Sequence, residues 1–566
     1  MSDQQWDHEY DVIVAGSGAG GMSAALSCQE RGLSTLVVEK DSVYGGTSAV
    51  SGGGVWIPCN DQIEGLGGDD TREEAMTYVK HLTVGEVPET KLAAYVDNAR
   101  LMVREMAERH DVHFQAVAQY PDYFPDQPGG KPGFRTMEPA PFDVSKLGEE
   151  RENQRPGYEG MYFLGRMSMS QVEAHTMLSR GRGWLGLTLG MLLRYWLDIP
   201  WRLRTKADRR ATLGQSMVGQ LRHAMQKRKI PLWLDTALDS LVEEDGGVTG
   251  VVARQQGRTL RLGARRGVIM ASGGFEANQA MREEYLPHPT DASWSVAPGC
   301  NEGDGIRAGQ ALGADTEFMN LTWGTPSIPT PEQSWAAGLF MERQLPGCVV
   351  VNGQGRRFVN EAIAYTEFVY AMIEEHQKNG AAVPCWLVFD ATFRKKYPMG
   401  PMMPSIMQPD RKLPAAWENK VYWKADTLAE LAEKTGIDTD GLARSVADIN
   451  RFSVLGKDEQ FGKGGTVFDR YYGDPQVTPN PCLAPIEKGP FYAMKVYPGE
   501  IGTKGGLKTD EAGRVLRDDG KPIGGLYATG NCSGAVMGRT YPGPGATLGP
   551  AMTFGYLAAK DIAREN

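Results

Sequence analysis

A loop near the end of the chain combines residue types that could act together on a carbonyl group. Residues 540–549 read Thr-Tyr-Pro-Gly-Pro-Gly-Ala-Thr-Leu-Gly, so Pro542 and Pro544 stiffen a loop whose glycines leave backbone N–H groups open. The hydroxyl of Tyr541 and the N–H of Gly545 could both donate to one oxygen, as an oxyanion hole does where enolate charge develops. A helix entry without any catalytic role is the alternative interpretation.

The first forty residues predict the elements of a dinucleotide site. A buried-strand pattern over residues 12–15 leads into Gly16-x-Gly18-x-x-Gly21, which opens a helix pattern. A second strand ends at Glu39, eighteen residues past Gly21, where a carboxylate can accept hydrogen bonds from ribose hydroxyls. The glycines allow a tight turn and let a pyrophosphate approach the helix N-terminus. Strand, glycines, helix, strand and acid in this register therefore predict a bound dinucleotide.

Further glycine-rich segments favour FAD over NAD(P). A second loop, residues 45–54, follows the second strand at once, and a flavin ring needs backbone close to its pyrimidine edge and N5. Strand-then-glycine patterns return at residues 267–275 and 524–531. Together these segments resemble the FAD fold of the fumarate reductase/succinate dehydrogenase flavoprotein group. The resemblance implies an α/β fold, with a discontinuous Rossmann-type FAD-binding domain and an inserted α+β substrate/catalytic domain.

The residues expected to contact FAD lie in these segments or directly beside them. A final helix, residues 547 to about 563, would direct its N-terminus towards the flavin. We assign cofactor contacts to Gly16, Ser17, Gly18, Ala19, Gly20, Glu39, Lys40, Gly46, Thr47, Ser48, Gly52, Gly53, Ala237, Ser272, Gly273, Gly530, Asn531, Thr547 and Leu548.

The order of the segments predicts that the cofactor domain is interrupted. Residues 1–280 hold the first nucleotide-binding strands, and residues 488–566 complete the FAD-binding domain. Residues 281–487 lack the glycine signatures and are expected to form the catalytic domain. An inserted domain would lie over the flavin ring, and ligands favour such interfaces.

Composition excludes several classes of function. A formal net charge of −10 argues against nucleic-acid binding. Seven scattered cysteines without a CxxC pair support neither a disulfide framework nor a metal site. The chain begins with polar and acidic groups and reaches its first strand within about ten residues. We therefore expect a cytoplasmic protein without a signal peptide.

Residues 180–210 depart from the pattern of a plain soluble enzyme. Their apolar run, residues 184–193, has about half the length of a membrane-spanning helix. Three tryptophans and a cluster of Arg and Lys with a net charge of +6 accompany this run in an acidic protein. We interpret the segment as a helix lying in the membrane interface, which would hold the protein on the inner face of the cell membrane. A helical hairpin packed on the body or in an oligomer contact is the alternative.

Five segments together resemble 3-ketosteroid Δ1-dehydrogenases over nearly the full length of the chain. With the 180–210 insertion, which the simpler soluble members lack, the chain resembles the larger, membrane-associated members that act on cholest-4-en-3-one. The resemblance implies a role in cholesterol degradation, a steroid substrate and an external electron acceptor, either a quinone or a soluble carrier. The five segments are residues 17–22, 120–123, 355–361, 505–507 and 540–549.

The same resemblance implies a role for each catalytic residue. Tyr541 and the N–H of Gly545 would bind the C3 carbonyl and favour enolisation. Tyr365 would remove a C2 proton, and Tyr123 would hydrogen-bond Tyr365 and ease its deprotonation. Flavin N5 would accept hydride from C1. Because a free phenol has a pKa of about 10, a tyrosine base needs such a partner at neutral pH.

Three other functions remain open at this point. A reductase of the fumarate or urocanate type would need Arg and His to clamp carboxylates, and no Arg/His cluster stands in the Tyr541 loop. Desaturation at C4–C5 of a 5α-steroid would use the same carbonyl clamp and a tyrosine base. A flavin-bound membrane adaptor without turnover would need none of Tyr123, Tyr365 and Tyr541.

Overall fold

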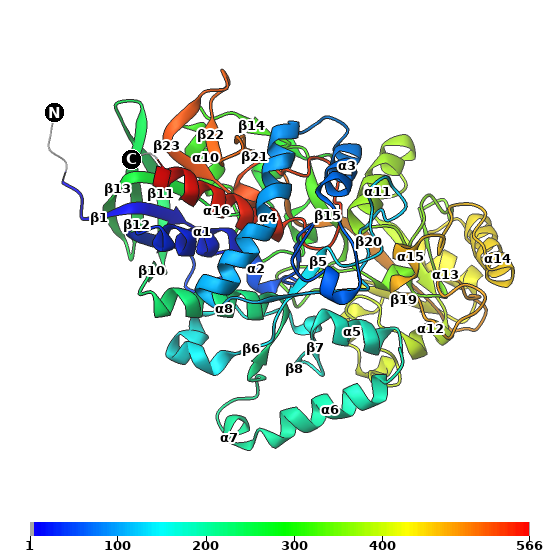
Figure 1. The fold of residues 1–566 in the computed structure, drawn as a ribbon. Helices are drawn as coiled ribbons and strands as arrows, with labels where there is room; N and C mark the ends of the chain where they lie inside the picture. Colours follow the sequence, from blue (N-terminus) through cyan, green and yellow to red (C-terminus); the bar gives the residue numbers. More distant parts are fainter. Residues whose placement is uncertain (1–4, 565–566) are drawn as a thin grey trace.

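The computed structural model, which describes residues 5–564, is built on two sheets that lie towards opposite sides of the molecule (Figure 1). The strands of the first sheet are β1 (His8–Ala15), β2 (Thr35–Val38), β10 (Leu232–Trp233), β11 (Thr236–Glu244), β12 (Gly247–Gln255), β13 (Arg258–Met270), β22 (Arg514–Leu516) and β23 (Pro522–Ala528). Their order is β10-β2-β1-β13-β12-β23-β22, with β11 paired to β12 and β13 also paired to β23. The pairs β10–β2, β2–β1, β1–β13 and β13–β23 are parallel. This is the predicted Rossmann-like α/β arrangement.

Small side chains let helices approach this sheet closely. All residues from Ala19 to Cys28 in α1 (Ala19–Glu30) are buried, because the helix packs on β1 and β2 and against α16 (Leu548–Arg564). A Cβ on Gly555 would come within 2.7 Å of the carbonyl oxygen of Gly20, so the two helix backbones nearly touch. The C-terminal helix therefore returns to the N-terminal nucleotide-binding unit, as predicted.

The second sheet belongs to the inserted part of the chain. Its strands are β15 (Thr322–Ile328), β16 (Ala337–Gly338), β17 (Cys348–Val351), β18 (Cys385–Phe389), β19 (Tyr422–Ala425) and β20 (Phe491–Thr503). They are ordered β16-β15-β20-β18-β17, with β19 also paired to β20. The helix α11 (Tyr365–Asn379) packs on β15 and β20, while α13 (Leu428–Thr435) packs on β19 and α14 (Thr439–Leu455) on β17.

One long strand carries the chain from the second sheet back to the first. β20 pairs with β18 and β19 no further than Val496 and with β15 as far as Thr503, so residues after 487 still belong to the second sheet. The chain rejoins the first sheet only at β22 and β23. The division into three segments at 280 and 487 stays a prediction.

Shorter elements surround the two sheets. The remaining helices are α2 (Gly46–Val50), α3 (Arg72–Thr83), α4 (Glu89–His110), α5 (Gln171–Leu178), α6 (Trp184–Leu197), α7 (Ile199–Arg202), α8 (Leu213–Lys227), α9 (Gln279–Tyr285), α10 (Asp304–Gln310), α12 (Ala391–Lys396) and α15 (Val467–Tyr471). The remaining strands are β3 (Val55–Trp56), β4 (Phe114–Ala116), β5 (Thr136–Pro139), β6 (Phe142–Asp143), β7 (Tyr162–Phe163), β8 (Met167–Ser168), β9 (Arg210–Ala211), β14 (Thr316–Glu317) and β21 (Gly506–Leu507).

The unusual 180–210 segment forms α6 and α7, which run along the lower edge of the molecule in Figure 1. Only one side of α6 is buried, at Met191 and Tyr195, which pack with Met167. Within residues 5–564, no helix combines the length and the apolar character that crossing a bilayer requires.

Candidate active site

Three tyrosines from distant parts of the chain meet between the two sheets. Tyr123 lies in the loop between β4 and β5, Tyr365 is the first residue of α11, and Tyr541 lies in the loop before α16. The hydroxyl of Tyr123 donates to the hydroxyl oxygen of Tyr365 at 3.0 Å. Ring centroids are 5.1 Å apart for Tyr123–Tyr541 and 5.5 Å for the other two pairs, all edge to face. The predicted catalytic phenols therefore form one cluster.

Burial and hydrogen bonding act against each other on these phenols. Burial raises the pKa of all three hydroxyls, because a phenolate loses hydration in the interior. For Tyr365 the nearby Tyr541 raises the pKa further, and the hydrogen bond from Tyr123 lowers it. For Tyr541 hydrogen bonding to Thr547, Tyr365 and the backbone of Gly545 opposes the effect of burial on its pKa.

The loop that carries Tyr541 is fixed through its backbone. The carbonyl oxygen of Pro542 accepts hydrogen bonds from the N–H of Tyr123, at 2.9 Å, and from the hydroxyl of Tyr78, at 2.6 Å. The carbonyl oxygen of Pro544 accepts one from the hydroxyl of Thr136 at 3.0 Å. Because the backbone of Tyr123 bonds directly to this loop, the two tyrosines hold a defined distance.

Gly545 occupies a position that other residues cannot take. Its φ is +92°, in the left-handed region, and a Cβ there would lie 2.6 Å from backbone atoms of Gly54 and Val55. The loop therefore lies directly on the end of the second glycine-rich segment. This contact brings the expected carbonyl clamp beside the expected flavin loop.

Aromatic side chains line the tyrosine cluster. Trp323 packs on Tyr541 with ring centroids 4.8 Å apart, Phe340 on Tyr365 at 5.4 Å, and Phe468 on Tyr123 at 4.9 Å. Such walls suit an apolar ligand whose polar group is gripped at one end.

The first group of expected cofactor residues gathers at the N-terminus of α1. Gly18, the N-cap, offers no side chain to cap the helix, and Ser48 accepts a hydrogen bond from the N–H of Ala19 at 3.0 Å. Glu39 accepts hydrogen bonds from the N–H and the hydroxyl of Ser17, at 3.0 and 2.6 Å. A carboxylate has about four acceptor positions, so Glu39 can bind a ribose as well.

A second group lies at the carboxyl end of β23. A small cavity is lined by Gly530, Asn531 and Thr547, together with Trp323. The indole N–H of Trp323 donates to the side-chain oxygen of Asn531 at 3.1 Å. Since Trp323 also packs on Tyr541, the cavity adjoins the tyrosine cluster. Leu548 begins α16 beside it.

The glycine-rich loops leave room for a large planar ligand. A Cβ added to Gly46, the first residue of α2, or to Gly52, which is exposed just after α2, would meet no atom within 4 Å. Bare backbone facing open space, next to an uncapped helix N-terminus, fits a dinucleotide with a flavin ring. The residues present therefore fit FAD.

Five expected cofactor residues already have protein neighbours. Lys40 forms ion pairs with Glu302, at 2.9 Å, and with Asp304, at 2.7 Å. Thr47 accepts a hydrogen bond from Asn301 at 2.9 Å, and a Cβ on Gly273 would meet that same Asn301 side chain. Ser272 donates to Cys532, and Ala237 pairs with Arg254 between β11 and β12. All the assigned cofactor contacts, including those of Gly16, Gly20 and Gly53, stay predictions.

Sequence reasoning missed several residues that build the site. Tyr78, Thr136 and Lys504 bond to the loop that carries Tyr541. Asn301 links the glycine-rich segments that follow β2 and β13 of the first sheet. The only sign of such a role in the sequence was the position of Lys504 between Thr503 and a pair of glycines, and this position did not indicate which groups Lys504 contacts.

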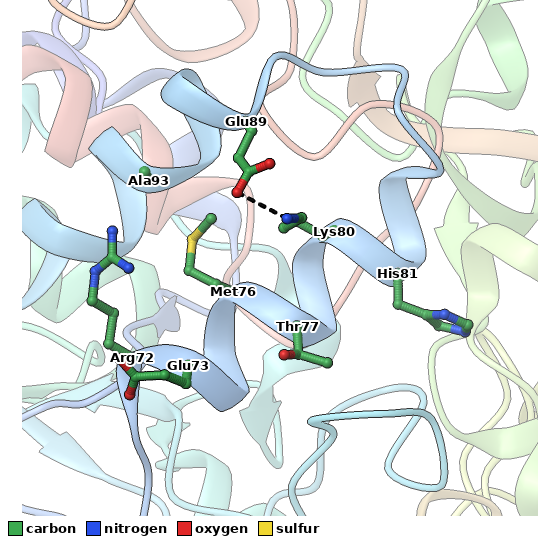
Figure 2. Close-up of a pocket in the computed structure, with 8 residues that line it drawn as sticks. All are labelled: Arg72, Glu73, Met76, Thr77, Lys80, His81, Glu89 and Ala93. Carbon is green, nitrogen blue, oxygen red and sulfur yellow. Dashed lines mark ion pairs between the residues drawn. The ribbon is translucent and has the colours of Figure 1, made fainter.

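A groove elsewhere on the surface is unrelated to this site. Figure 2 shows it between α3 and α4, where Lys80 and Glu89 form an ion pair of 2.8 Å. It contains none of the residues expected to act on substrate or FAD.

Comparison with known proteins defines first the class and then the family. Residues 11–548 match the family described as FAD binding domain, so the protein is a flavoprotein of that class with FAD as cofactor. The chain is 43% identical to 3-oxosteroid 1-dehydrogenase of Comamonas testosteroni, over 98% of this chain and 97% of that protein. It is 42% identical to the enzyme of the same name from Mycolicibacterium smegmatis, with the same coverage.

A solved structure extends this similarity to the whole fold. The 3-ketosteroid Δ1-dehydrogenase of Sterolibacterium denitrificans, in complex with 1,4-androstadiene-3,17-dione, is 52% identical with a TM-score of 0.97. The match covers 99% of this chain and all of that one. The chain belongs to the 3-oxosteroid 1-dehydrogenase family.

Proposed function

We propose that this flavoprotein introduces the C1–C2 double bond into 3-ketosteroids. The observation that carries the proposal is the meeting of Tyr123, Tyr365 and Tyr541 beside Gly545, at the point where the flavin loops end. A carbonyl clamp and a base in one aromatic-walled site suit a ketone with little other polarity. Family membership supports the same reaction.

Each residue has a distinct task in this reaction. The hydroxyl of Tyr541 and the N–H of Gly545 donate to the C3 carbonyl oxygen, which stabilises enolate charge and acidifies the C2 protons. Tyr365 takes one C2 proton, while the hydrogen bond from Tyr123 stabilises its phenolate. Bound FAD supplies the acceptor for the hydride that leaves C1.

The position of Tyr365 in its helix favours the same task. As the first residue of α11 it lies at the positive end of the helix dipole, where an anion is stabilised by about 0.3–1 kcal/mol. This contribution adds to the hydrogen bond from Tyr123. Both reduce the free energy needed to form a buried phenolate.

Anaerobic mixing with two steroids tests the reaction. Purified enzyme is mixed with cholest-4-en-3-one or with androst-4-ene-3,17-dione, and the flavin absorbance and product mass are recorded. We expect bleaching of the flavin band and a product two mass units lighter, desaturated at C1–C2. Absence of bleaching with both steroids defeats the proposal. A third mixture with a 5α-3-ketosteroid tests the other desaturation: if only this steroid bleaches the flavin and its product is desaturated at C4–C5, that reaction is assigned instead.

We also propose that α6 and α7 rest on the anionic surface of the inner face of the cell membrane. Leu185, Leu189, Leu193 and Trp196, spaced along one side of α6, are between 51% and 66% exposed. Exposed Arg and Lys side chains flank them, including Arg204. An apolar stripe with a basic border in an acidic protein fits anionic lipid better than a second copy of this chain.

The helix α5, which packs on α6, connects this segment with the catalytic cluster. His175 of α5 stacks on Tyr471 at 4.1 Å, and Tyr471 stacks on Tyr120 at 4.6 Å, three residues from Tyr123. We propose that a steroid leaving the bilayer enters the site from this side of the protein. This supports cholest-4-en-3-one, with its long apolar side chain, as a substrate, and a role in cholesterol degradation. The electron acceptor, a quinone or a soluble carrier, stays open.

Vesicle binding tests the membrane proposal. Co-sedimentation with phosphatidylglycerol vesicles should be lost in the double variant Leu189→Glu with Trp196→Glu, because two charges enter the apolar stripe. Leu455→Glu, at an exposed leucine of α14, which packs on the second sheet, should bind vesicles as the wild type does. Equal vesicle binding by all three proteins contradicts the proposal. So does a wild type that binds no vesicles but forms, without detergent, a dimer that the double variant cannot form.

A further inference from the structure

We propose that Lys504 is a positioning residue that holds the carbonyl-binding loop against the helix that carries the catalytic base. The inference rests on the proposed function only through the role of Tyr541. Lys504 directly follows β20 and is completely buried. Its ammonium donates to the carbonyl oxygens of Gly538, at 3.2 Å, of Arg539, and of Thr540, at 2.8 Å.

These three acceptors are consecutive and end one residue before Tyr541. An ammonium has three N–H donors, so each can be directed to one of the three carbonyls. Together with the hydrogen bonds on Pro542 and Pro544, they leave the loop's backbone anchored on both sides of Tyr541. These hydrogen bonds thus fix the position of the Tyr541 backbone, and with it the point from which its side chain extends.

Aromatic rings connect the same ammonium to the catalytic cluster. Its Nζ lies 4.4 Å from the ring centroid of Trp323, which packs on Tyr541, and 5.9 Å from that of Tyr370. The hydroxyl of Tyr370, on α11, donates to the carbonyl oxygens of Arg539 at 3.1 Å and Thr322 at 3.2 Å. Lys504 therefore stands where β15, β20, α11 and the loop meet.

A buried cation at this point is not explained by stability alone. In the described part of the chain its hydrogen bonds all go to backbone carbonyls, and burial lowers the pKa of Lys504 to about 7. Glu367 and Glu86 raise that pKa, and Arg539 lowers it. Glu367 lies on α11, two residues after Tyr365, so the charge of Lys504 also attracts the base's helix. An apolar side chain would avoid the desolvation but would leave three carbonyls without donors.

The test compares Lys504→Met with Lys508→Met, a partly exposed lysine of the same segment that pairs with Asp315. Both variants are loaded with FAD, and turnover of androst-4-ene-3,17-dione is measured with substrate deuterated at C2 or at C1. Loss of about 1 Å in placement reduces rates by about 100-fold. We expect that fall in kcat for Lys504→Met, with a larger isotope effect at C2, because proton removal beneath a loosened clamp becomes more rate-limiting. Lys508→Met should match the wild type.

Other outcomes overturn the inference. A kcat for Lys504→Met within twofold of the wild type removes the positioning role. A fall in kcat with both isotope effects unchanged shows only that less enzyme is folded. If Lys504→Met loses FAD or fails to fold, the same measurements are made on Tyr370→Phe, which removes one hydrogen-bond donor to the carbonyl oxygen of Arg539. We expect this variant to show a raised C2 isotope effect and a smaller fall in kcat. An unchanged isotope effect there overturns the inference, whereas absent turnover in the wild type overturns the proposed function instead.

Discussion

A buried phenol can act as a base only where its surroundings lower the free energy of the phenolate. Tyr365 has the hydroxyl of Tyr123 at 3.0 Å and the first turn of α11 around it, while burial alone raises its pKa. In the proposed reaction the proton therefore leaves C2 most easily when a steroid carbonyl already binds Tyr541 and Gly545. Base and clamp are useful only together.

Replacement of the base tests this dependence. Tyr365→Phe should keep the ring packing and the flavin spectrum and lower kcat by about 1,000-fold, the range expected for loss of a general base. Steady-state turnover with androst-4-ene-3,17-dione measures the change. Tyr120→Phe is the matched control, because Tyr120 is equally buried but its hydroxyl contacts Tyr472 rather than Tyr365. Near-normal turnover of Tyr365→Phe would remove it from the mechanism.

The clamp can be tested through its backbone. Gly545→Ala places a Cβ 2.6 Å from backbone atoms of Gly54 and Val55 and forces a residue with a side chain to a φ of +92°. The loop must move, so we expect kcat to fall by about 100-fold, as on loss of one oxyanion donor. Gly65→Ala, where a Cβ meets no neighbour, should leave kcat unchanged. Equal rates for the two variants would show that Gly545 does not form the clamp.

At the scale of elements, the sequence predicted the helices and strands whose formation depends on neighbouring residues. The strand–glycine–helix order of β1 and α1, the apolar helix α6 and the final helix α16 are confirmed, because each depends on neighbouring residues. Tyr123 and Tyr365 lie 242 residues apart, and only the family resemblance indicated that they meet. The length of β20 depends on pairing with β18 and β19 in its first half and with β15 up to Thr503, which no local pattern encodes.

Buried polar contacts were the least predictable part of the site. Lys504, Asn301 and Tyr78 have ordinary sequence neighbours, and their importance comes from partners 25 or more residues away. Glu39 was predicted to bind a ribose, and its bonds to Ser17 could not be read from spacing alone.

The first helix offers a prediction about the cofactor. A Cβ on Gly21 would lie 2.1 Å from the carbonyl oxygen of Gly16, so Gly21→Ala pushes the N-terminus of α1 away from β1. The N–H groups that would bind the pyrophosphate then lose their alignment. We expect a lower ratio of FAD to protein after gel filtration, measured by absorbance. Gly190→Ala, in α6 with open space around it, should retain FAD like the wild type. A full FAD complement in Gly21→Ala would contradict the assigned site.

In the whole molecule the two sheets come together beside a buried carboxyl, because the N–H of Phe275, after β13, donates to the hydroxyl of Thr503 in β20 at 3.1 Å. Glu276 accepts a hydrogen bond from Asn301 at 2.6 Å, and Asn301 also donates to Thr47 in the glycine-rich loop. The other carboxyl oxygen has no hydrogen-bond partner among the described residues. Burial raises the pKa of Glu276 from 4.5 to about 7, so the folded protein keeps this group protonated where the unfolded chain ionises it.

The sign of this pKa shift predicts how stability depends on pH. The folded state binds the proton more tightly, so the stabilisation is complete below pH 4.5 and is lost as the pH rises through about 7. The shift corresponds to about 3 kcal/mol. Glu276→Gln keeps an acceptor for Asn301 and cannot ionise. Its melting temperature should therefore fall less than that of the wild type between pH 5 and pH 8, the interval that spans the raised pKa of Glu276. Glu283→Gln, at an exposed carboxylate of α9, is the control and should show the same change of melting temperature with pH as the wild type. If Glu276→Gln also shows that same change, Glu276 is already ionised in the folded protein.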